Sequence, residues 1–319
     1  MSVLVPAPGA HGGDGPRLAA ALGVDSAAVL DLSLSLNPAA PDTGEVVGKH
    51  LDALSRYPEP GPATAALADA LAVDPDRVVL TNGGAEAIAL VAAAVGGHVV
   101  EPEFGLHPRT SGPRWRSNPH NPTGRLAPAA AAAGVWDEAF YPLATGRWTR
   151  GDADRGAFVV GSLTKVFACP GLRVGYVLAP DGAAARRVAA GQTTWSVNGL
   201  AASALADLLA AADLPAWAGA IARWRAELVG VLAAAGLVAE PSDAPWVLVR
   251  APGLRARLGP HGVLVRDCTS FGLPDHARVA VPDPAGLARL ADALRATRSG
   301  DAGPRLSRVS VPRTAEVPR

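Results

Sequence analysis

Two lysines, Lys49 and Lys165, stand in a chain of 319 residues whose lysines and arginines together number 29. An arginine keeps its proton, so it cannot replace an amine that must lose a proton and attack a carbonyl carbon. Lys49 lies in a polar Gly-Lys-His run, and we interpret it as a surface residue. Lys165 lies in Ser-Leu-Thr-Lys-Val-Phe-Ala-Cys-Pro-Gly-Leu-Arg, residues 162–173, where a surface-loop lysine is the alternative to an amine that reacts covalently.

Two groups close to Lys165 in the sequence are candidates for binding an anion. Ser162 precedes the lysine by three positions and Arg173 follows it by eight, so a loop that leaves a strand can bring the three together. A further anion site is predicted at Gly83-Gly84-Ala85, which opens a helix directly after a strand, because free backbone N–H groups and the helix dipole favour negative charge there. A Gly-Gly pair is a weak signal alone, and Ser162 and Arg173 add weight to it.

Asp137 and Asn121 are candidates for holding a polar ring. Asp137, in Val-Trp-Asp-Glu-Ala-Phe, ends an apolar run, and α/β sheets bind ligands at the carboxyl ends of such strands. A helix N-cap or turn aspartate is the alternative. Asn121 belongs to Ser-Asn-Pro-His-Asn-Pro-Thr-Gly, residues 117–124, whose prolines and glycine fix an irregular turn and leave the amide free to donate. An aldehyde cofactor with a phosphate and a pyridine ring needs this combination: an amine, an anion site, a carboxylate and an amide donor.

The composition excludes several classes of protein. A hydrophobic share of 49% with 18% charged residues predicts a folded core, and 29 acidic against 29 basic residues give no field that would attract nucleic acid or a membrane surface. We therefore expect neither as a partner. Cys169 and Cys268 are interpreted as free, inert core thiols in a reducing compartment. Without a secretory signal or a long apolar stretch near the start, a cytoplasmic protein is expected, and no metal site is predicted.

The hydrophobic pattern predicts an α/β fold. Short apolar runs at 77–81, 158–161 and 174–179 alternate with helical patterns at 85–95 and from 182 onward, which indicates a mostly parallel, buried sheet flanked by helices. From about residue 200 this alternation of apolar runs and helical patterns ends. Helical material interrupted at Pro215 is followed by strands at 246–250, 262–266 and 277–281 and by a helix near 285–297, which predicts a smaller α+β domain.

We divide the chain accordingly. Residues 1–35 form an N-terminal segment that packs with the small domain, residues 36–213 form the large domain, and residues 214–298 form the small domain. Residues 299–319 contain three prolines and four arginines without helix or strand periodicity, and we predict that they are a disordered tail.

In these motifs the chain resembles the fold-type-I pyridoxal-phosphate enzymes of the class I/II aminotransferase family. The resemblance rests on the run around Lys165, on Asn-Pro-His-Asn-Pro-Thr-Gly and on Asp-Glu-Ala-Phe, in that order. Within the family it is similar to the cobalamin-pathway threonine-phosphate decarboxylases and the histidinol-phosphate aminotransferases, through His-Gly-Gly-Asp at 11–14, Leu-Asp-Leu-Ser-Leu-Ser-Leu-Asn-Pro at 30–38 and Tyr-Pro-Glu-Pro at 57–60. Arg-Asp-Cys-Thr-Ser-Phe-Gly-Leu, residues 266–273, favours the decarboxylase branch.

The resemblance implies pyridoxal 5'-phosphate as the cofactor. Lys165 would bind its aldehyde, Asp137 would hold the pyridine nitrogen protonated, and Asn121 would bond the phenolic oxygen. The phosphate would be held by Gly84, Ala85, Ser162 and Arg173.

The resemblance also implies a stacking ring, a second subunit and a substrate site. His107 matches the position of the ring that stacks on the cofactor, and Tyr57 that of a tyrosine reaching the phosphate of the neighbouring subunit, so a homodimer is expected. Arg278 would grip the substrate carboxylate, with Asn37 and Arg266 also in the substrate site. His11, Gly12 and Gly13 would supply donors to a substrate phosphate, a flexible glycine loop being the alternative.

The middle of the chain departs from the family pattern. Only 11 positions separate His107 from Asn118, too few for a parallel crossover, which needs roughly a dozen residues or more, so a βα unit must be missing and the sheet narrower. The 14 positions from Thr123 to Asp137 leave room for a turn or two of helix over 128–134. The replacement segment carries Arg109, Arg114 and Arg116, which we interpret as a solvated loop; contact with a phosphorylated substrate is the alternative. Phe140 stands where the histidinol-phosphate branch has a tyrosine.

The leading hypothesis is an aminotransferase-family enzyme acting on an anionic, phosphorylated small-molecule amino acid, of the threonine-phosphate decarboxylase kind. A histidinol-phosphate-type aminotransferase and a cofactor-binding, non-catalytic partner in a biosynthetic complex are the alternatives. A nucleotide-binding α/β protein is disfavoured, because neither a Gly-Lys-Ser/Thr phosphate loop nor Gly-x-Gly-x-x-Gly after the first strand is present.

Overall fold

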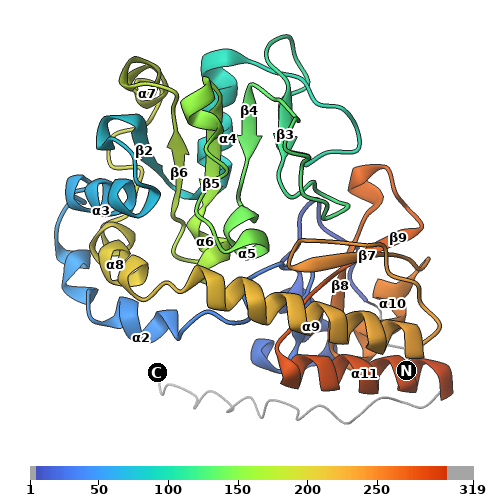
Figure 1. The fold of residues 1–319 in the computed structure, drawn as a ribbon. Helices are drawn as coiled ribbons and strands as arrows, with labels where there is room; N and C mark the ends of the chain where they lie inside the picture. The colour runs from blue at the N-terminus through green and yellow to red at the C-terminus, as the bar shows by residue number, and fades with distance from the viewer. Residues whose placement is uncertain (1–4, 300–319) are drawn as a thin grey trace, which may run out of the picture.

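The larger sheet of the protein contains five short strands. This computed structural model describes residues 5–299 of the chain. The spatial order is β2-β6-β5-β4-β3 (Figure 1). The strands are β2 (Val78–Thr81), β3 (Trp115–Ser117), β4 (Val135–Asp137), β5 (Phe158–Ser162) and β6 (Gly175–Leu178). Only β6 runs antiparallel to its two neighbours, so β2, β3, β4 and β5 share one direction. The predicted mostly parallel sheet is confirmed.

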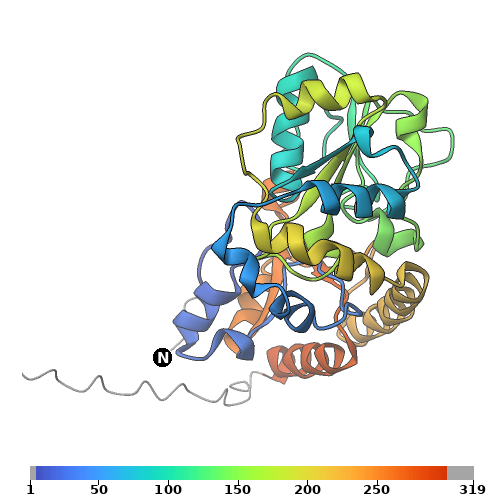
Figure 2. The same ribbon diagram turned by 90° about the vertical axis from the view of Figure 1, so that its left-hand side faces the viewer.

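Helices cover both faces of this sheet. Every residue of β2, β5 and β6 is buried, as expected of strands packed on two sides. One face packs against α4 (Gly83–Val95) and α7 (Gly182–Ala189), and the other against α3 (Gly61–Leu71) and α8 (Gly199–Ala210). Figures 1 and 2 show α3 and α8 side by side. The apolar runs of the sequence therefore become two separate cores.

A second sheet has the order β1-β8-β9-β7. Its strands are β1 (Leu30–Leu32), β7 (Trp246–Arg250), β8 (Val263–Asp267) and β9 (His276–Ala280). β1 pairs in parallel with β8, and the other pairs are antiparallel. The long α9 (Leu214–Ala234) and α11 (Pro284–Ser299) run side by side against it (Figure 1). Through β1, the N-terminal part of the chain thus shares a sheet with strands from the last third of the chain. The domain limits given above stay a prediction.

The remaining elements are short. The α-helices are α1 (Gly15–Leu22), α2 (Thr43–Gly48), α5 (Tyr141–Thr145), α6 (Leu163–Val166) and α10 (Leu254–Leu258). Single turns of 3-10 helix occupy Ser26–Ala28, Leu51–Ser55, Pro75–Arg77, Asp152–Arg155, Gly259–His261 and Thr269–Phe271. The predicted break at Pro215 is confirmed, because α8 ends at Ala210 and α9 begins with Pro215 in its first turn.

The shortened middle of the chain is confirmed. From the end of α4 at Val95 to Trp115 the chain forms no helix or strand, apart from a single bridge between His98 and Arg114, so β3 is an edge strand. The prediction of a turn or two of helix over 128–134 is wrong, because that segment contains only a turn that is not helical. Arg150 Nη2 donates hydrogen bonds to the carbonyls of Pro128, Ala129 and Ala131 (3.1, 2.7 and 3.1 Å), which occupies carbonyls that a helix would use.

Within residues 5–299 no single helix is both long and apolar enough to cross a membrane. Only α8 and α9 taken together, with a bend of 82° between them, are long and apolar enough for a span. The predicted tail falls on residues outside the described part, except Ser299, with which α11 ends.

Candidate active site

A cavity of about 200 Å³ lies where the two sheets meet. The parallel strands of the larger sheet bring Ser117, Asp137 and Ser162 to one edge, because each is the last residue of its strand. The second sheet contributes Arg266 from β8 and Arg278 from β9. The cavity therefore takes its polar groups from both sheets.

Most residues predicted from the sequence reach this cavity. The predicted residues that line it are His11, Gly12, Gly84, Ala85, Asn121, Asp137, Ser162, Lys165, Arg173, Arg266 and Arg278. Four others do not line it: Gly13, Asn37, Tyr57 and His107.

Lys165 follows β5 at the start of the short helix α6. Burial, the largest cause, and the positive charges of Arg278 and Arg173 lower the pKa of its amine to about 8, against the opposite effect of Asp137. About a tenth of the amine is therefore unprotonated at pH 7, far more than for a lysine that titrates near 10.5, and this favours a nucleophilic role. Asn37 fixes the backbone around Lys165. Its backbone N–H donates to the Lys165 carbonyl at 3.1 Å, and its side-chain amide donates to the Val166 carbonyl at 2.9 Å.

The start of α4 forms an anion cradle with Ser162 and Arg173. The Asn82 side chain makes no capping hydrogen bond, and the Glu86 side chain accepts the Asn82 N–H at 2.6 Å, so N–H groups of the first turn stay available to a ligand. Gly83 has a φ of +78°, and a Cβ there would lie 2.2 Å from Arg173 Nη2, so the guanidinium packs directly on this glycine. A Cβ on Gly84 would lie 3.2 Å from Ser162 Cβ. The close approach of backbone, hydroxyl and guanidinium suits a phosphate group.

Asn121 is oriented by Arg278. Arg278 Nη1 donates to Asn121 Oδ1 at 2.7 Å, which leaves the amide nitrogen of Asn121 free to donate into the cavity. Arg278 lies over the Trp246 ring, with 4.8 Å from its guanidinium carbon to the ring centroid. Burial lowers the pKa of Arg278 to about 10, so it still carries its charge at neutral pH.

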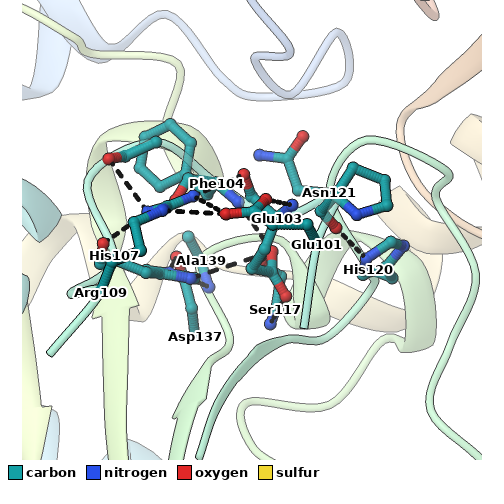
Figure 3. Close-up of polar contacts among 12 residues, drawn as sticks. Glu101, Glu103, Phe104, His107, Arg109, Ser117, His120, Asn121, Asp137 and Ala139 are labelled. Carbon is teal, nitrogen blue, oxygen red and sulfur yellow. Dashed lines mark hydrogen bonds and ion pairs between the residues drawn. The ribbon is translucent and has the colours of Figure 1, made fainter. Parts of the chain in front are cut away.

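Asp137 is held from two sides. Its Oδ1 accepts a hydrogen bond from the Ala139 N–H at 3.0 Å, and its Oδ2 lies 3.0 Å from His107 Nε2 (Figure 3). The His107 ring is fully buried against Phe104 and Trp115, at centroid distances of 5.6 and 5.4 Å. His107 thus reaches the cavity only through Asp137, and the phenylalanines that line the cavity are Phe104, Phe140 and Phe271.

The N-terminal segment closes one side of the cavity. Arg266 donates to the carbonyls of Gly9 (3.2 Å) and Ala10 (2.5 Å) and to Ser270 Oγ (2.8 Å). Gly12 packs so closely that a Cβ there would lie 2.4 Å from the Ser33 carbonyl oxygen. Burial, and the charge of Arg266, lower the pKa of His11.

Other predicted residues lie elsewhere. Tyr57 is 73% exposed and stacks on Trp195 at 4.3 Å between ring centroids. Gly13 donates its N–H to Ser33 Oγ at 2.9 Å. Lys49 is exposed, as predicted. Arg114 and Arg116 line a separate hollow on the far side of β3, so they do not approach this cavity.

Both cysteines are free thiols, as predicted. Cys268 is buried and Cys169 is half-buried, and burial raises the pKa of each thiol to about 11. Neither is therefore a reactive thiolate at neutral pH.

Sequence reasoning missed Glu103, Phe104 and Thr164. Thr164 Oγ1 shares a 2.7 Å hydrogen bond with Ser162, and its place within Ser-Leu-Thr-Lys was a usable signal. Glu103 and Phe104 precede His107 in Glu-Phe-Gly-Leu-His, but nothing in a loop sequence fixes which side chains turn inward.

Comparison with known proteins identifies the family. Residues 115–294 match the family model "Aminotransferase class I and II". The chain is 29% identical to a threonine-phosphate decarboxylase of Salmonella typhimurium, covering 91% of this chain and 97% of the relative. It is 31% identical to a histidinol-phosphate aminotransferase of Thiobacillus denitrificans, covering 87% of this chain and 74% of the relative.

Solved structures agree with this result. L-threonine-O-3-phosphate decarboxylase from Porphyromonas gingivalis aligns with a TM-score of 0.69 at 25% identity, covering 83% of this chain and 98% of that one. Histidinol-phosphate aminotransferase from Sinorhizobium meliloti, solved in complex with pyridoxal-5'-phosphate, aligns with a TM-score of 0.76 at 19% identity, covering 90% and 95%. With its family match spanning more than half of the sequence, the chain belongs to the class I and II aminotransferases and is a pyridoxal-phosphate-dependent enzyme.

Proposed function

We propose that this enzyme acts on an amino acid that carries a second anionic group, a phosphate, and that it is a decarboxylase of the threonine-phosphate kind. The observation that carries the proposal is a pair of buried arginines, Arg266 and Arg278, directly opposite each other on β8 and β9. Like charges opposite each other destabilise a sheet unless a ligand or counter-ion compensates them.

The charge of the cavity supports an anionic substrate. Among the described residues no carboxylate lies within ion-pair distance of Arg266 or Arg278, and Asp137 is the only carboxylate on the cavity wall. Lys165 and Arg173 add positive charge to the same wall. In a chain of net charge zero, this local excess favours a ligand with several negative charges.

The residues present fit pyridoxal phosphate. Ser162, Arg173 and the first turn of α4 would hold its phosphate, beside the point where the Arg173 guanidinium packs on Gly83. The free amide nitrogen of Asn121 would donate to its phenolic oxygen, and Asp137 would face its ring nitrogen. Lys165 would supply the amine for covalent attachment, which its lowered pKa supports.

When bound, pyridoxal phosphate supplies an electron sink that weakens the bonds at the substrate Cα. The protein side chains then decide which bond breaks. Arg278 would hold the substrate carboxylate, and Arg266 with the Gly12 segment would hold the phosphate, so the two groups fix how the substrate lies in the cavity. Lys165 would carry a proton to or from Cα.

Two observations favour decarboxylation over transamination. Phe140 places an apolar ring 5.9 Å from Lys165 Nζ, at the position where the histidinol-phosphate branch has a tyrosine hydroxyl. The threonine-phosphate decarboxylase of Salmonella typhimurium is also similar over 97% of its length. Several similar relatives are histidinol-phosphate aminotransferases, which makes transamination of histidinol phosphate the second candidate.

One experiment separates these candidates. The purified enzyme with pyridoxal phosphate is incubated with threonine phosphate and, separately, with histidinol phosphate and a keto acid that accepts the amino group, while carbon dioxide and keto product are followed. Carbon dioxide from threonine phosphate is the expected result. A keto product from histidinol phosphate would show the aminotransferase instead, and a protein that binds cofactor but converts neither would point to a non-catalytic partner.

We also propose a homodimer. Four large apolar side chains lie exposed near one another on and beside the 3-10 helix Leu51–Ser55, namely Leu51, Leu54, Tyr57 and its stacking partner Trp195. Contiguous exposed apolar groups of this kind mark an interface. A second copy covering them would bring Tyr57 towards the neighbouring cofactor phosphate.

A further inference from the structure

Three ionisable side chains form a row that leads away from the cavity. His107 Nε2 lies 3.0 Å from Asp137 Oδ2, and His107 Nδ1 lies 3.9 Å from Glu103 Oε1 (Figure 3). The side chains of His107 and Glu103 are 0% and 2% exposed, so water does not screen them. Only Asp137 reaches the cavity wall.

Glu103 is fixed in place by the edge strand. Its Oε2 accepts the Ser117 N–H at 2.9 Å, its Oε1 accepts the Phe104 N–H at 2.9 Å, and the Ser117 hydroxyl also donates to Oε1. These donors favour a carboxylate held rigidly against His107. Glu103 lies in the loop between α4 and β3, just before His107 and the shortened connection that follows it.

The hydrogen bonds determine where the protons lie. Asp137 Oδ2 can only accept, so His107 Nε2 carries a proton. Nδ1 is buried without a hydrogen-bond partner among the described residues, and Glu103 is the carboxylate beside it. A lone pair on Nδ1 that faces a buried carboxylate oxygen is costly, so a proton on Nδ1, paired with Glu103 across 3.9 Å, is the favourable arrangement.

We propose that Glu103 is a positioning residue: its carboxylate pairs with a protonated His107 Nδ1 across 3.9 Å and so fixes the imidazole, which in turn holds the Asp137 carboxylate toward the cofactor ring. The inference rests on the proposed role of Asp137 at the ring nitrogen. With the Ala139 N–H on one oxygen and His107 on the other, Asp137 is held in a single orientation. Loss of the outer partner of such a chain typically weakens ligand binding about 10-fold or more.

Three variants test this. Glu103→Leu removes the partner of Nδ1. Glu103→Gln keeps the shape and can donate an amide N–H to Nδ1, but it has no negative charge to stabilise a protonated Nδ1. Glu101→Gln is the matched control, because Glu101 is an exposed carboxylate of the same segment that bonds Arg109 and does not touch His107.

The first readout is the ¹⁵N NMR signal of the His107 ring in cofactor-free protein, assigned by its loss in His107→Gln. We expect a protonated Nδ1 in the wild type and in Glu101→Gln, and an unprotonated Nδ1 in both Glu103 variants. The second readout is the dissociation constant of pyridoxal phosphate, from tryptophan fluorescence. We expect about 10-fold weaker binding for Glu103→Leu and a value within about 3-fold of wild type for Glu103→Gln and Glu101→Gln.

A His107 Nδ1 signal that stays unchanged in Glu103→Gln would overturn the proposal. If Glu103→Leu does not fold, the test rests on Glu103→Gln alone. Equal cofactor affinity of Glu103→Leu and wild type would overturn it as well. If the wild type itself failed to bind pyridoxal phosphate, the proposed role of Asp137 would fall, while the NMR comparison would still report on the Glu103–His107 proton.

Discussion

Arg278 on β9 of the second sheet donates a 2.7 Å hydrogen bond to Asn121, in the turn that follows β3 of the first. One guanidinium thereby touches the residue proposed to contact the cofactor and faces the cavity proposed to take the substrate. The indole of Trp246 reinforces the connection by donating to the Pro122 carbonyl at 2.8 Å. Binding of the substrate carboxylate and orientation of the Asn121 amide are therefore linked.

Replacing Arg278 should separate stability from function. Arg278 is buried without a carboxylate partner among residues 5–299, so Arg278→Met should raise the free energy of unfolding of the ligand-free protein by on the order of 1–3 kcal/mol. The KM for threonine phosphate should rise about 30-fold or more, since a buried charged contact is lost. Denaturant unfolding and steady-state kinetics measure the two effects. A less stable variant with an unchanged KM would contradict this account.

The lowered pKa of Lys165 predicts a pH dependence of stability. An unfolded lysine titrates near 10.5 and the folded one near 8, so between these values the unfolded chain binds more protons and stability rises with pH. Below about pH 8 the burial penalty is present in full. The free energy of unfolding of cofactor-free wild type, relative to Lys165→Met, should rise by on the order of 2 kcal/mol from pH 8 to pH 10. Parallel curves for the two proteins would refute the assignment.

The raised pKa of Glu138, next to Asp137, predicts a pH dependence of stability of the opposite sign. Burial, the largest cause, raises its pKa from 4.5 to about 7, so between these values the folded protein binds more protons and stability falls as pH rises. Glu138→Gln should therefore gain on the order of 2 kcal/mol over wild type when the pH is raised from 4.5 to 8. Glu227→Gln, at an exposed position on α9, is the control and should show no such gain.

Gly83 should not tolerate a side chain. With a φ of +78° and Arg173 Nη2 only 2.2 Å from an added Cβ, Gly83→Ala should displace the guanidinium and weaken pyridoxal-phosphate binding about 10-fold or more. Gly48→Ala is the matched control, because nothing lies within 4 Å of its Cβ position at the end of α2. Fluorescence titration with the cofactor compares them; equal affinities would count against the cradle.

The exposed apolar cluster predicts the oligomeric state. Leu54 is 71% exposed, so Leu54→Glu should leave the monomer stable within about 0.5 kcal/mol while disrupting a dimer formed through this surface. Sedimentation velocity should find a wild-type dimer and a mostly monomeric variant. A monomeric wild type, or a variant that stays dimeric, would move the interface elsewhere.

Strand ends and motif residues could be predicted from the sequence, whereas loop contacts could not. The apolar runs before Asp137 and Ser162 indicated strands, and parallel strands bring their ends to one edge, so both side chains reach the cavity. Asn37 shows the limit: its motif pointed to the substrate, but its amide bonds the backbone beside Lys165. The alanines of residues 128–134 favour a helix locally, but the segment forms only a turn, and the distant Arg150 hydrogen-bonds its carbonyls instead.

The position of β3 at the edge of the larger sheet also bears on how this fold tolerates deletion. A strand pairs only with its neighbours, so material removed beyond β3 leaves the ladders between β4, β5 and β6 intact. Asp137 and Ser162 end the interior strands β4 and β5, and Lys165 follows β5. A shorter chain on that flank thus removes no ladder of the strands that carry the residues proposed to bind the cofactor, and the contacts it must keep are those of Glu103 and His107 behind Asp137.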